Sequence, residues 1–517
     1  MLVHSFLEKS SRQFPEKKAV WHKDEWITYG KIEEQANRIG CFLLEQGLKR
    51  GERVALLMEN SFNFITAYFG ILKAGGVVVG LNTEITSEDL EYLVLNSGAR
   101  FLFVNSSRLR LFYPVKEKLT TLKYVVVSGN SNVVTSQNAS FGQNSVIMYN
   151  YILDTYTANK PDSRPIDIDL AEIVYTSGST GSPKGVMLSH LNLVSNMHSI
   201  AQYLHLNADD RMMVVLPFTY IYGKSLLLTH FLVGGSVIID NRFVYPNKVL
   251  ETMKNMEATG FAGVPSTFTI LLNRSSLKEY TFPALRYVTQ AGGHMAVSIQ
   301  KEVSQVFKPA ELYIMYGATE AAPRLSYLEP SKLMEKLGSI GIPVPNVDLF
   351  VADENGRPVG IGKEGEIVAR GSNIMQGYWK DPEGTKQVLK NGLYYTGDLG
   401  KQDDDGYIFI VGRKKDIIKV KGFRVSSKEI EEKILEMDNI IEAAVIGVPD
   451  AVLGEAVKAF VVTSDGCKIT QNEILSYLKP HLSTYKLPKH IEFRNVLPKN
   501  KSGKIMKTEL AAVEAKG

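Results

Sequence analysis

Residues 175–186, YTSGSTGSPKGV, combine glycines, hydroxyl side chains and one lysine directly after an apolar run that predicts a strand. Glycines let a backbone turn tightly around a polyanion, hydroxyl and amide groups donate hydrogen bonds to phosphate oxygens, and a lysine neutralises charge. The segment is not a P-loop, because Pro183 precedes Lys184 and Gly185 follows it. A flexible linker is not expected between a buried strand and the apolar run that follows. The segment therefore predicts a phosphate-binding loop.

The surrounding sequence alternates apolar, β-rich runs with amphipathic segments of helix length through about the first four hundred residues. This alternation predicts α/β layers with a largely parallel, buried sheet. Strands are expected at residues 53–58, 101–104, 124–127, 173–175, 212–216 and 236–239, and helices at residues 32–46, 62–73 and 298–306. Residues 130–144, rich in Ser, Asn, Val and Gln, predict a surface loop.

The alternation of apolar runs and amphipathic segments changes near residue 398. A turn rich in Gly and Asp (403–406) precedes a strand (407–411) and a basic run (412–415). A helix (427–437), two strands (443–448 and 456–462), a further helix (471–480) and a basic tail follow. We therefore predict a large multi-sheet α/β domain over residues 1–412 and a small α+β domain over residues 413–517.

The bulk composition excludes several classes of protein. A length of 517 residues requires at least two domains, and a formal net charge of +4 gives no case for a nucleic-acid partner. The two cysteines, Cys41 and Cys467, are far apart, which fits a reducing cytoplasm. No apolar run approaches the length of a membrane span, and the N-terminus does not read as a secretion signal. We therefore expect a cytoplasmic protein that has no membrane as a partner.

Four further motifs follow the phosphate-binding segment in order. They are YGATE at Tyr316–Glu320, YYTGD at Tyr394–Asp398, GRKKD with KGFRV at residues 412–416 and 421–425, and PKNKSGK at residues 498–504. With residues 175–186 they resemble, over nearly the whole chain, the adenylate-forming superfamily of acyl-CoA synthetases, peptide-synthetase adenylation domains and luciferases. The resemblance implies activation of a carboxylic acid by ATP.

The chemistry of such a reaction gives these residues a rationale. Forcing a carboxylate against the α-phosphate requires cations and a metal aimed at the developing charge. Glu320 suits Mg²⁺, and Asp398 can accept from two ribose hydroxyls because a carboxylate is an acceptor only. By resemblance, the catalytic residues are Lys504, Glu320, Thr180 and Lys184. The implied nucleotide-binding residues are Thr176, Ser177, Gly178, Ser179, Thr180, Gly181, Lys184, Tyr316, Gly317, Ala318, Thr319, Asp398, Arg413 and Lys504.

The resemblance also implies motion of the small domain. In the family this domain rotates between the two half-reactions about a hinge residue, and Lys415 occupies that position. Rotation would withdraw Lys504 after adenylation and bring residues 421–425 towards the site. Such a rearrangement is a conformational gate between the two steps.

The acyl pocket is expected to include Tyr220, Ile221, Tyr222, Lys224, Gly263, Gln290, Ala291, Gly292 and Ala321. Many acyl-CoA synthetases carry histidine where Tyr220 stands, which counts against assignment to the standard fatty-acid or acetate groups. A short, partly polar pocket is expected rather than a long acyl tunnel, because Tyr220, Tyr222, Met315 and Tyr316 are all expected there. Lys224 could face a polar group of the substrate or extend outwards to solvent. Peptide-synthetase domains usually carry aspartate where Ile221 stands, which counts against an amino-acid substrate.

The expected function is therefore ATP- and Mg²⁺-dependent activation of a small carboxylic acid as acyl-AMP, with transfer to a phosphopantetheine thiol. The thiol belongs to CoA or to a separate carrier protein, since no attachment site for phosphopantetheine is found in the sequence. The alternative is a stand-alone adenylation enzyme that loads an amino acid, proline for instance, onto a carrier protein in natural-product biosynthesis. Nucleic acid and membrane are not expected as partners.

Overall fold

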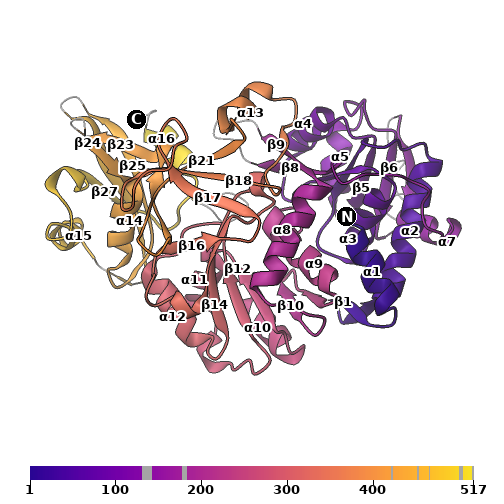
Figure 1. Cartoon of the computed structure of the whole chain (residues 1–517), viewed down its shortest axis with the longest axis horizontal. Helices are drawn as coiled ribbons and strands as arrows, with labels where there is room; N and C mark the ends of the chain where they lie inside the picture. The colour runs from indigo at the N-terminus through magenta and orange to yellow at the C-terminus, as the bar shows by residue number, and fades with distance from the viewer. Residues whose placement is uncertain are drawn as a thin grey trace.

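The computed structural model describes residues 1–130, 143–176, 183–420, 423–450, 453–464, 466–467, 469–499 and 505–514. Within these residues the chain forms three β-sheets of fourteen, eight and five strands, with helices between and around them. Figure 1 shows a large α/β body that holds the first four hundred residues and a smaller body, coloured towards yellow, beside it. The expected fold class, a large N-terminal α/β domain with a small C-terminal α+β domain, is confirmed.

The fourteen-stranded sheet runs in the order β17-β18-β21-β22-β16-β15-β14-β13-β12-β10-β11-β1-β2, and β20 pairs with β21. The neighbours β1, β11, β10, β12, β13 and β14 pair in parallel, in this spatial order. The pairs β14–β15, β16–β22 and β21–β22 are antiparallel. Its strands are β1 (Lys18–His22), β2 (Glu25–Thr28), β10 (Arg211–Val214), β11 (Ser236–Ile239), β12 (Gly260–Gly263), β13 (Tyr287–Gln290), β14 (Glu311–Tyr316), β15 (Ser326–Leu328), β16 (Ser339–Pro343), β17 (Val347–Ala352), β18 (Gly365–Gly371), β20 (Leu389–Lys390), β21 (Leu393–Gln402) and β22 (Ile408–Arg413).

The eight-stranded sheet runs in the order β19-β9-β8-β4-β3-β5-β6-β7. Its strands are β3 (Arg53–Leu57), β4 (Val77–Gly80), β5 (Phe101–Asn105), β6 (Tyr124–Ser128), β7 (Ser145–Met148), β8 (Leu170–Thr176), β9 (Lys184–Ser189) and β19 (Gly377–Tyr378). All six strands expected in the first four hundred residues are present, with ends displaced by three residues at most. Most of the predicted surface loop at 130–144 lies outside the described residues.

Helices α8 (His190–Tyr203) and α9 (Ile221–Val233) lie between the two large sheets (Figure 1). Ser189 and Asn192 form a capping box at the start of α8, and α9 ends at Gly234 with φ +74°. Almost every residue of α9 is buried, as expected of a helix that is covered on all sides. The helices expected at 32–46, 62–73 and 298–306 are α2 (Tyr29–Glu45), α3 (Phe62–Lys73) and α12 (Val297–Val306).

The small domain has its own sheet and core. Its strands, in the order β24-β23-β26-β25 with β27 beside β26, are β23 (Ile417–Val420), β24 (Phe423–Ser426), β25 (Ile440–Asp450), β26 (Gly454–Thr463) and β27 (His490–Phe493). Its helices are α14 (Ser427–Leu435), α15 (Gln471–Leu478) and α16 (Lys507–Glu514). The chain leaves the fourteen-stranded sheet after β22 and enters this one at β23. The boundary between residues 412 and 413 stays a prediction.

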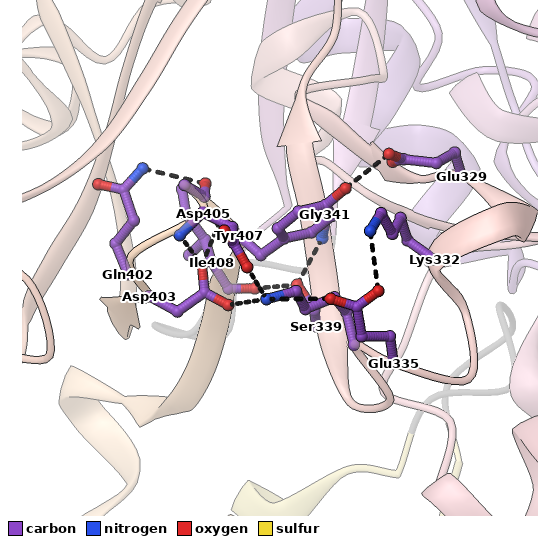
Figure 2. Close-up of polar contacts among 12 residues, drawn as sticks. Glu329, Lys332, Glu335, Ser339, Gly341, Gln402, Asp403, Asp405, Tyr407 and Ile408 are labelled. Atoms are coloured by element: carbon purple, nitrogen blue, oxygen red, sulfur yellow. Dashed lines mark hydrogen bonds and ion pairs between the residues drawn. The ribbon is translucent and has the colours of Figure 1, made fainter.

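A polar network fixes the turn between β21 and β22 against the loop between β15 and β16 (Figure 2). The Lys336 ammonium lies 2.9 Å from the carboxylate of Asp403 and 5.1 Å from the ring centre of Tyr407. The Tyr407 hydroxyl donates to Glu329 at 2.6 Å. These contacts hold β21 and β22 in a fixed position relative to β14, and all three strands carry residues expected to bind the nucleotide.

Candidate active site

A cavity of about 840 Å³ opens where β10, β12, β13 and β14 end. Ligands of open α/β sheets bind at this edge, outside the carboxyl ends of the strands. The cavity also reaches the β8–β9 hairpin, the start of α9, and strands β21 and β22. The predicted site residues that line it are Thr176, Lys184, Tyr220, Ile221, Tyr222, Ala291, Gly292, Gly317, Ala318, Thr319, Glu320, Asp398, Arg413 and Lys415.

Thr176 and Lys184 face each other across the β8–β9 hairpin, so the loop between them begins and ends at the cavity. The Lys184 ammonium lies 3.3 Å from the Asp381 carboxylate and 4.8 Å from the ring centre of Tyr378. Five expected phosphate-binding residues, Ser177, Gly178, Ser179, Thr180 and Gly181, lie outside the described residues, as does Lys504. Their roles stay predictions.

The Asp398 carboxylate lines the cavity and lies between two donors. Its Oδ2 accepts from the Tyr316 hydroxyl at 2.7 Å, and its Oδ1 lies 2.8 Å from Nε of Arg413, its register partner on β22. Burial, and then the Asp398 charge, raise the pKa of the Tyr316 phenol well above its ordinary value, so the phenol keeps its proton. Each carboxylate oxygen has two lone pairs, so the group retains capacity for ribose hydroxyls.

Glu320 stands in the short 3₁₀ turn η4 (Thr319–Ala321) and lines the same cavity. Its Oε1 accepts from the Tyr378 hydroxyl at 2.7 Å. Burial, and then the Glu320 charge, raise the pKa of Tyr378, which therefore remains a donor. Among the described residues no group of three His, Cys, Asp or Glu side chains could hold a metal. Mg²⁺ commonly binds through one or two carboxylates with phosphate oxygens, and Glu320 fits that chemistry.

The turn that carries Thr319 and Glu320 depends on Gly317. A Cβ at this position would lie 1.9 Å from the carbonyl oxygen of Pro323, so no larger residue fits without backbone movement. The chain therefore folds back on itself after β14, and both side chains face the cavity.

Two tyrosines at the start of α9, Tyr220 and Tyr222, also line the cavity. The Tyr222 hydroxyl donates to the backbone oxygen of Thr289 at 3.1 Å, and the Tyr220 hydroxyl accepts from Asn82 at 2.8 Å. Burial raises the pKa of both phenols. Both rings are therefore uncharged and are held in place by hydrogen bonds.

Four residues expected in the acyl pocket do not line this cavity. Lys224 is buried in α9 against Glu172, because its side chain turns away from the cavity towards β8. Gln290 ends β13 and donates to the Gly293 oxygen at 2.8 Å, and it lines a neighbouring cavity instead. Gly263 lies within β12, and Ala321 packs in an apolar cluster. Tyr316 likewise does not line this cavity; it lines the neighbouring one and donates its hydroxyl hydrogen to Asp398.

The neighbouring cavity, of about 410 Å³, is lined by residues of both domains. His294 of the large domain pairs with Glu432 of α14 at 2.7 Å. The Lys428 ammonium donates to the backbone oxygen of Ile410 at 2.6 Å. These contacts hold the small domain beside the site. The expected hinge, Lys415, lies between β22 and β23 and lines the larger cavity.

Three residues with a clear place in the site were not predicted from the sequence. Tyr378 holds Glu320 and Asp381 pairs with Lys184, but both lie in a stretch without a recognisable motif. Arg324 lines the cavity four residues after the YGATE motif. A charged residue inside the apolar run Ala321, Ala322, Pro323 and Leu325 was the signal that could have revealed it.

Comparison with known proteins identifies the family. A family model described as AMP-binding enzyme matches residues 7–379, and one described as AMP-binding enzyme C-terminal domain matches residues 429–504. A long-chain-fatty-acid–CoA ligase of Yersinia pestis is 35% identical over 100% of this chain and 94% of its own length.

Two of the solved structures similar to this chain illustrate the match, and each covers 99% of it. ATP-bound MatB from Rhodopseudomonas palustris has a TM-score of 0.87 at 29% identity, over 99% of its own chain. The anthranilate CoA ligase AuaEII in complex with anthranoyl-AMP has a TM-score of 0.90 at 25% identity, over 97% of its own chain. In the described residues, no helix is both long and apolar enough to cross a membrane. The chain belongs to the AMP-binding enzyme family, and it is an adenylate-forming ligase that joins a carboxylic acid to a thiol with formation of AMP.

Proposed function

We propose that this ligase activates a compact carboxylic acid with ATP and Mg²⁺ and transfers the acyl group to CoA. The observation that carries the proposal is the single cavity that holds Thr176, Lys184 and Glu320 beside Asp398 and Arg413. Phosphate-binding, metal-binding and ribose-binding groups thus surround one space. The two free thiols, Cys41 and Cys467, suit a reducing cytoplasm as the compartment.

The residues of the cavity divide the work of adenylation. Thr176, Lys184 and the loop between them bind the phosphates, and Asp398 with Arg413 orients the ribose. Glu320, oriented by Tyr378, would hold Mg²⁺, which would supply positive charge to the phosphate oxygens. Lys504 supplies the cation at the α-phosphate as the acid carboxylate attacks and pyrophosphate leaves. Rotation about Lys415 then withdraws Lys504 and admits the thiol, which attacks the acyl carbon and displaces AMP.

The volume of the cavity supports a compact acid. Ligand sites typically measure about 300–1,000 Å³, and this one, of about 840 Å³, must hold the nucleotide together with the acid. Tyr220 and Tyr222, fixed by hydrogen bonds, narrow the end that remains for the acyl group. The long-chain acid in the name of the Yersinia pestis relative is therefore not the substrate we propose.

CoA is the acceptor we propose because two of the similar proteins are named as CoA ligases. An amino acid as substrate would require a buried acceptor for its ammonium group, and Ile221 stands where peptide-synthetase domains usually carry aspartate. The carboxylates of Glu320 and Asp398 line the cavity. We assign Glu320 to Mg²⁺ and Asp398 to the ribose, so neither is left to accept from a substrate ammonium group. A carrier protein as acceptor is the outcome that a test with CoA would reveal.

The test is a panel of acids in an ATP–pyrophosphate exchange assay, followed by chromatography of the spent nucleotide with and without CoA. Compact acids should give AMP and pyrophosphate, and CoA should then be consumed. Formation of ADP would refute adenylation, and efficient turnover of palmitate would refute the compact pocket. Adenylation without consumption of CoA would point to another thiol.

A further inference from the structure

Arg324 is a buried cation at the cavity, and no described residue of opposite charge pairs with it. Among the described residues, eight Asp, Glu, Lys or Arg residues are buried, and Arg324 is 2% exposed. The other seven are each in an ion pair. These pairs are Glu8 with Lys73, Glu172 with Lys224, Asp210 with Arg286, Asp240 with Arg242, and Asp398 with Arg413. An unpaired buried charge is costly, so this exception requires a reason.

The neighbours of the guanidinium are aromatic and neutral. Its central carbon lies 4.9 Å from the ring centre of Tyr222, which also lines the cavity. The Tyr203 phenol is close enough for the Arg324 charge to offset part of the rise in its pKa that burial causes. In the described part of the chain, Arg324 Nε has no hydrogen-bond acceptor. Cation–π contact stabilises such a charge only in part.

The backbone of Arg324 is fixed in place. Its N–H donates to the Asn196 side chain at 2.8 Å, and its carbonyl oxygen accepts from Asn196 at 2.8 Å and from Asn373 at 3.0 Å. Both asparagines are buried. A residue held this firmly at the wall of a binding cavity is preorganised for a ligand, because little conformational freedom is lost when the ligand binds.

We propose that Arg324 binds a second carboxylate on the acid substrate, so that the compact acid of the proposed function is a dicarboxylic acid. The inference rests on the proposed function and names its substrate class. One carboxylate reacts at the end of the cavity that holds Glu320 and Lys184. The other pairs with Arg324 beside Tyr222, where a planar guanidinium suits a carboxylate through two parallel hydrogen bonds.

An acid with an apolar end would leave the guanidinium unpaired and newly desolvated. Sites built to bind a polar group reject analogues that lack it by large factors, because the buried polar group of the protein then has no partner. Arg324 thus selects for a charged end as well as contributing affinity. A purely structural role, as a cation over the Tyr222 ring, would give no such selection.

The test uses pairs of acids matched in shape, succinate against 4-methylpentanoate and glutarate against 5-methylhexanoate, in the pyrophosphate exchange assay. The wild type should favour the dicarboxylic member by at least about 10²-fold in kcat/KM. Arg324→Met should lower kcat/KM for the dicarboxylic acids by about 10²–10³-fold, mainly through KM, and leave the branched acids unchanged or improved. Arg324→Lys should keep part of the preference. Arg370→Met, at an exposed arginine on β18 paired with Asp348, is the matched control and should change neither class.

Each outcome decides between the proposals. Preference of the wild type for the branched acids, or an unchanged ratio in Arg324→Met, overturns the inference and leaves the proposed function standing. Absence of AMP formation with every acid overturns the proposed function itself. If Arg324→Met does not fold, the preference of the wild type and of Arg324→Lys still decides. A rise in thermal midpoint with succinate plus AMP, absent with 4-methylpentanoate plus AMP, is the readout that does not depend on activity.

Discussion

Replacing Lys224 by methionine tests whether this residue belongs to the framework or to the acyl pocket. Its ammonium pairs with Glu172, and the two side chains are 1% and 0% exposed. The ammonium also lies 5.2 Å from the ring centre of Tyr68. Glu172 Oε1 has no hydrogen-bond partner among the described residues, so Lys224 is its main compensation. Removal of one member of a buried pair costs about 3–5 kcal/mol, because the other charge stays buried without a partner.

We therefore expect Lys224→Met to lower the free energy of unfolding by about 3–5 kcal/mol. The KM for the acid should stay close to that of the wild type, because Lys224 does not line the cavity. A change of threefold at most is expected, which corresponds to less than about 1.4 kcal/mol, the equivalent of a tenfold change. The assay is guanidinium and thermal unfolding followed by tryptophan fluorescence, with pyrophosphate exchange on the folded protein. The double variant Glu172→Gln with Lys224→Met is the control and should recover most of the stability, because no charge remains buried. Wild-type stability combined with a large rise in KM would refute this reasoning and return Lys224 to the pocket.

Three further predictions concern the site and the charge state of the fold. Tyr378→Phe removes the hydrogen bond to Glu320, and such a bond to a charged group contributes about 1.5–3 kcal/mol. Adenylation should therefore slow about 10–100-fold and recover in part at high Mg²⁺. The same dependence of pyrophosphate exchange on Mg²⁺ concentration in the variant and the wild type would contradict this prediction. Lys504→Ala should slow formation of acyl-AMP by at least about 10²–10³-fold and spare the reaction of acyl-AMP with CoA. Lys415→Pro should spare formation of acyl-AMP and slow its reaction with CoA, because proline fixes the backbone at the hinge. Equal losses in both half-reactions in single-turnover kinetics would exclude the rotating domain. Burial lowers the pKa of His22 and His190 from 6.5 to about 4. The unfolded chain therefore binds protons first as the pH falls, and the free energy of unfolding should fall between about pH 6.5 and about pH 4. The thermal midpoint should fall less steeply with pH in His22→Phe than in the wild type, and an equal slope would contradict the lowered pKa of His22.

The elements were predicted best where their local pattern is strong. The expected boundaries of α3 and β11, residues 62–73 and 236–239, match the structure. The sequence of helix α9 shows no helical period of apolar residues. Nearly all of its residues are buried between two sheets, so its apolar positions do not fall on one face. The fourteen-stranded sheet joins strands from β1 to β22, and strand order of this kind follows from long-range packing rather than from local preference.

The sequence by itself determined the chemistry of this protein. Phosphate loop, YGATE, YYTGD and the basic C-terminal motif are local combinations of residues whose functional groups define adenylation wherever the fold places them. Their order along the chain was sufficient for the family and for the polar residues Thr176, Lys184, Glu320, Asp398 and Arg413 that line the cavity.

The tertiary structure alone decided which partner each polar group has. Tyr378 reaches Glu320 across 58 residues of sequence, and Lys224 meets Glu172 across 52. Arg324 is recognisable as an unpaired cation only once every buried charge in the described structure has been matched with its neighbour. The physical reason is that the free energy of a buried charge depends on what surrounds it in space, and those neighbours come from elements distant in the chain.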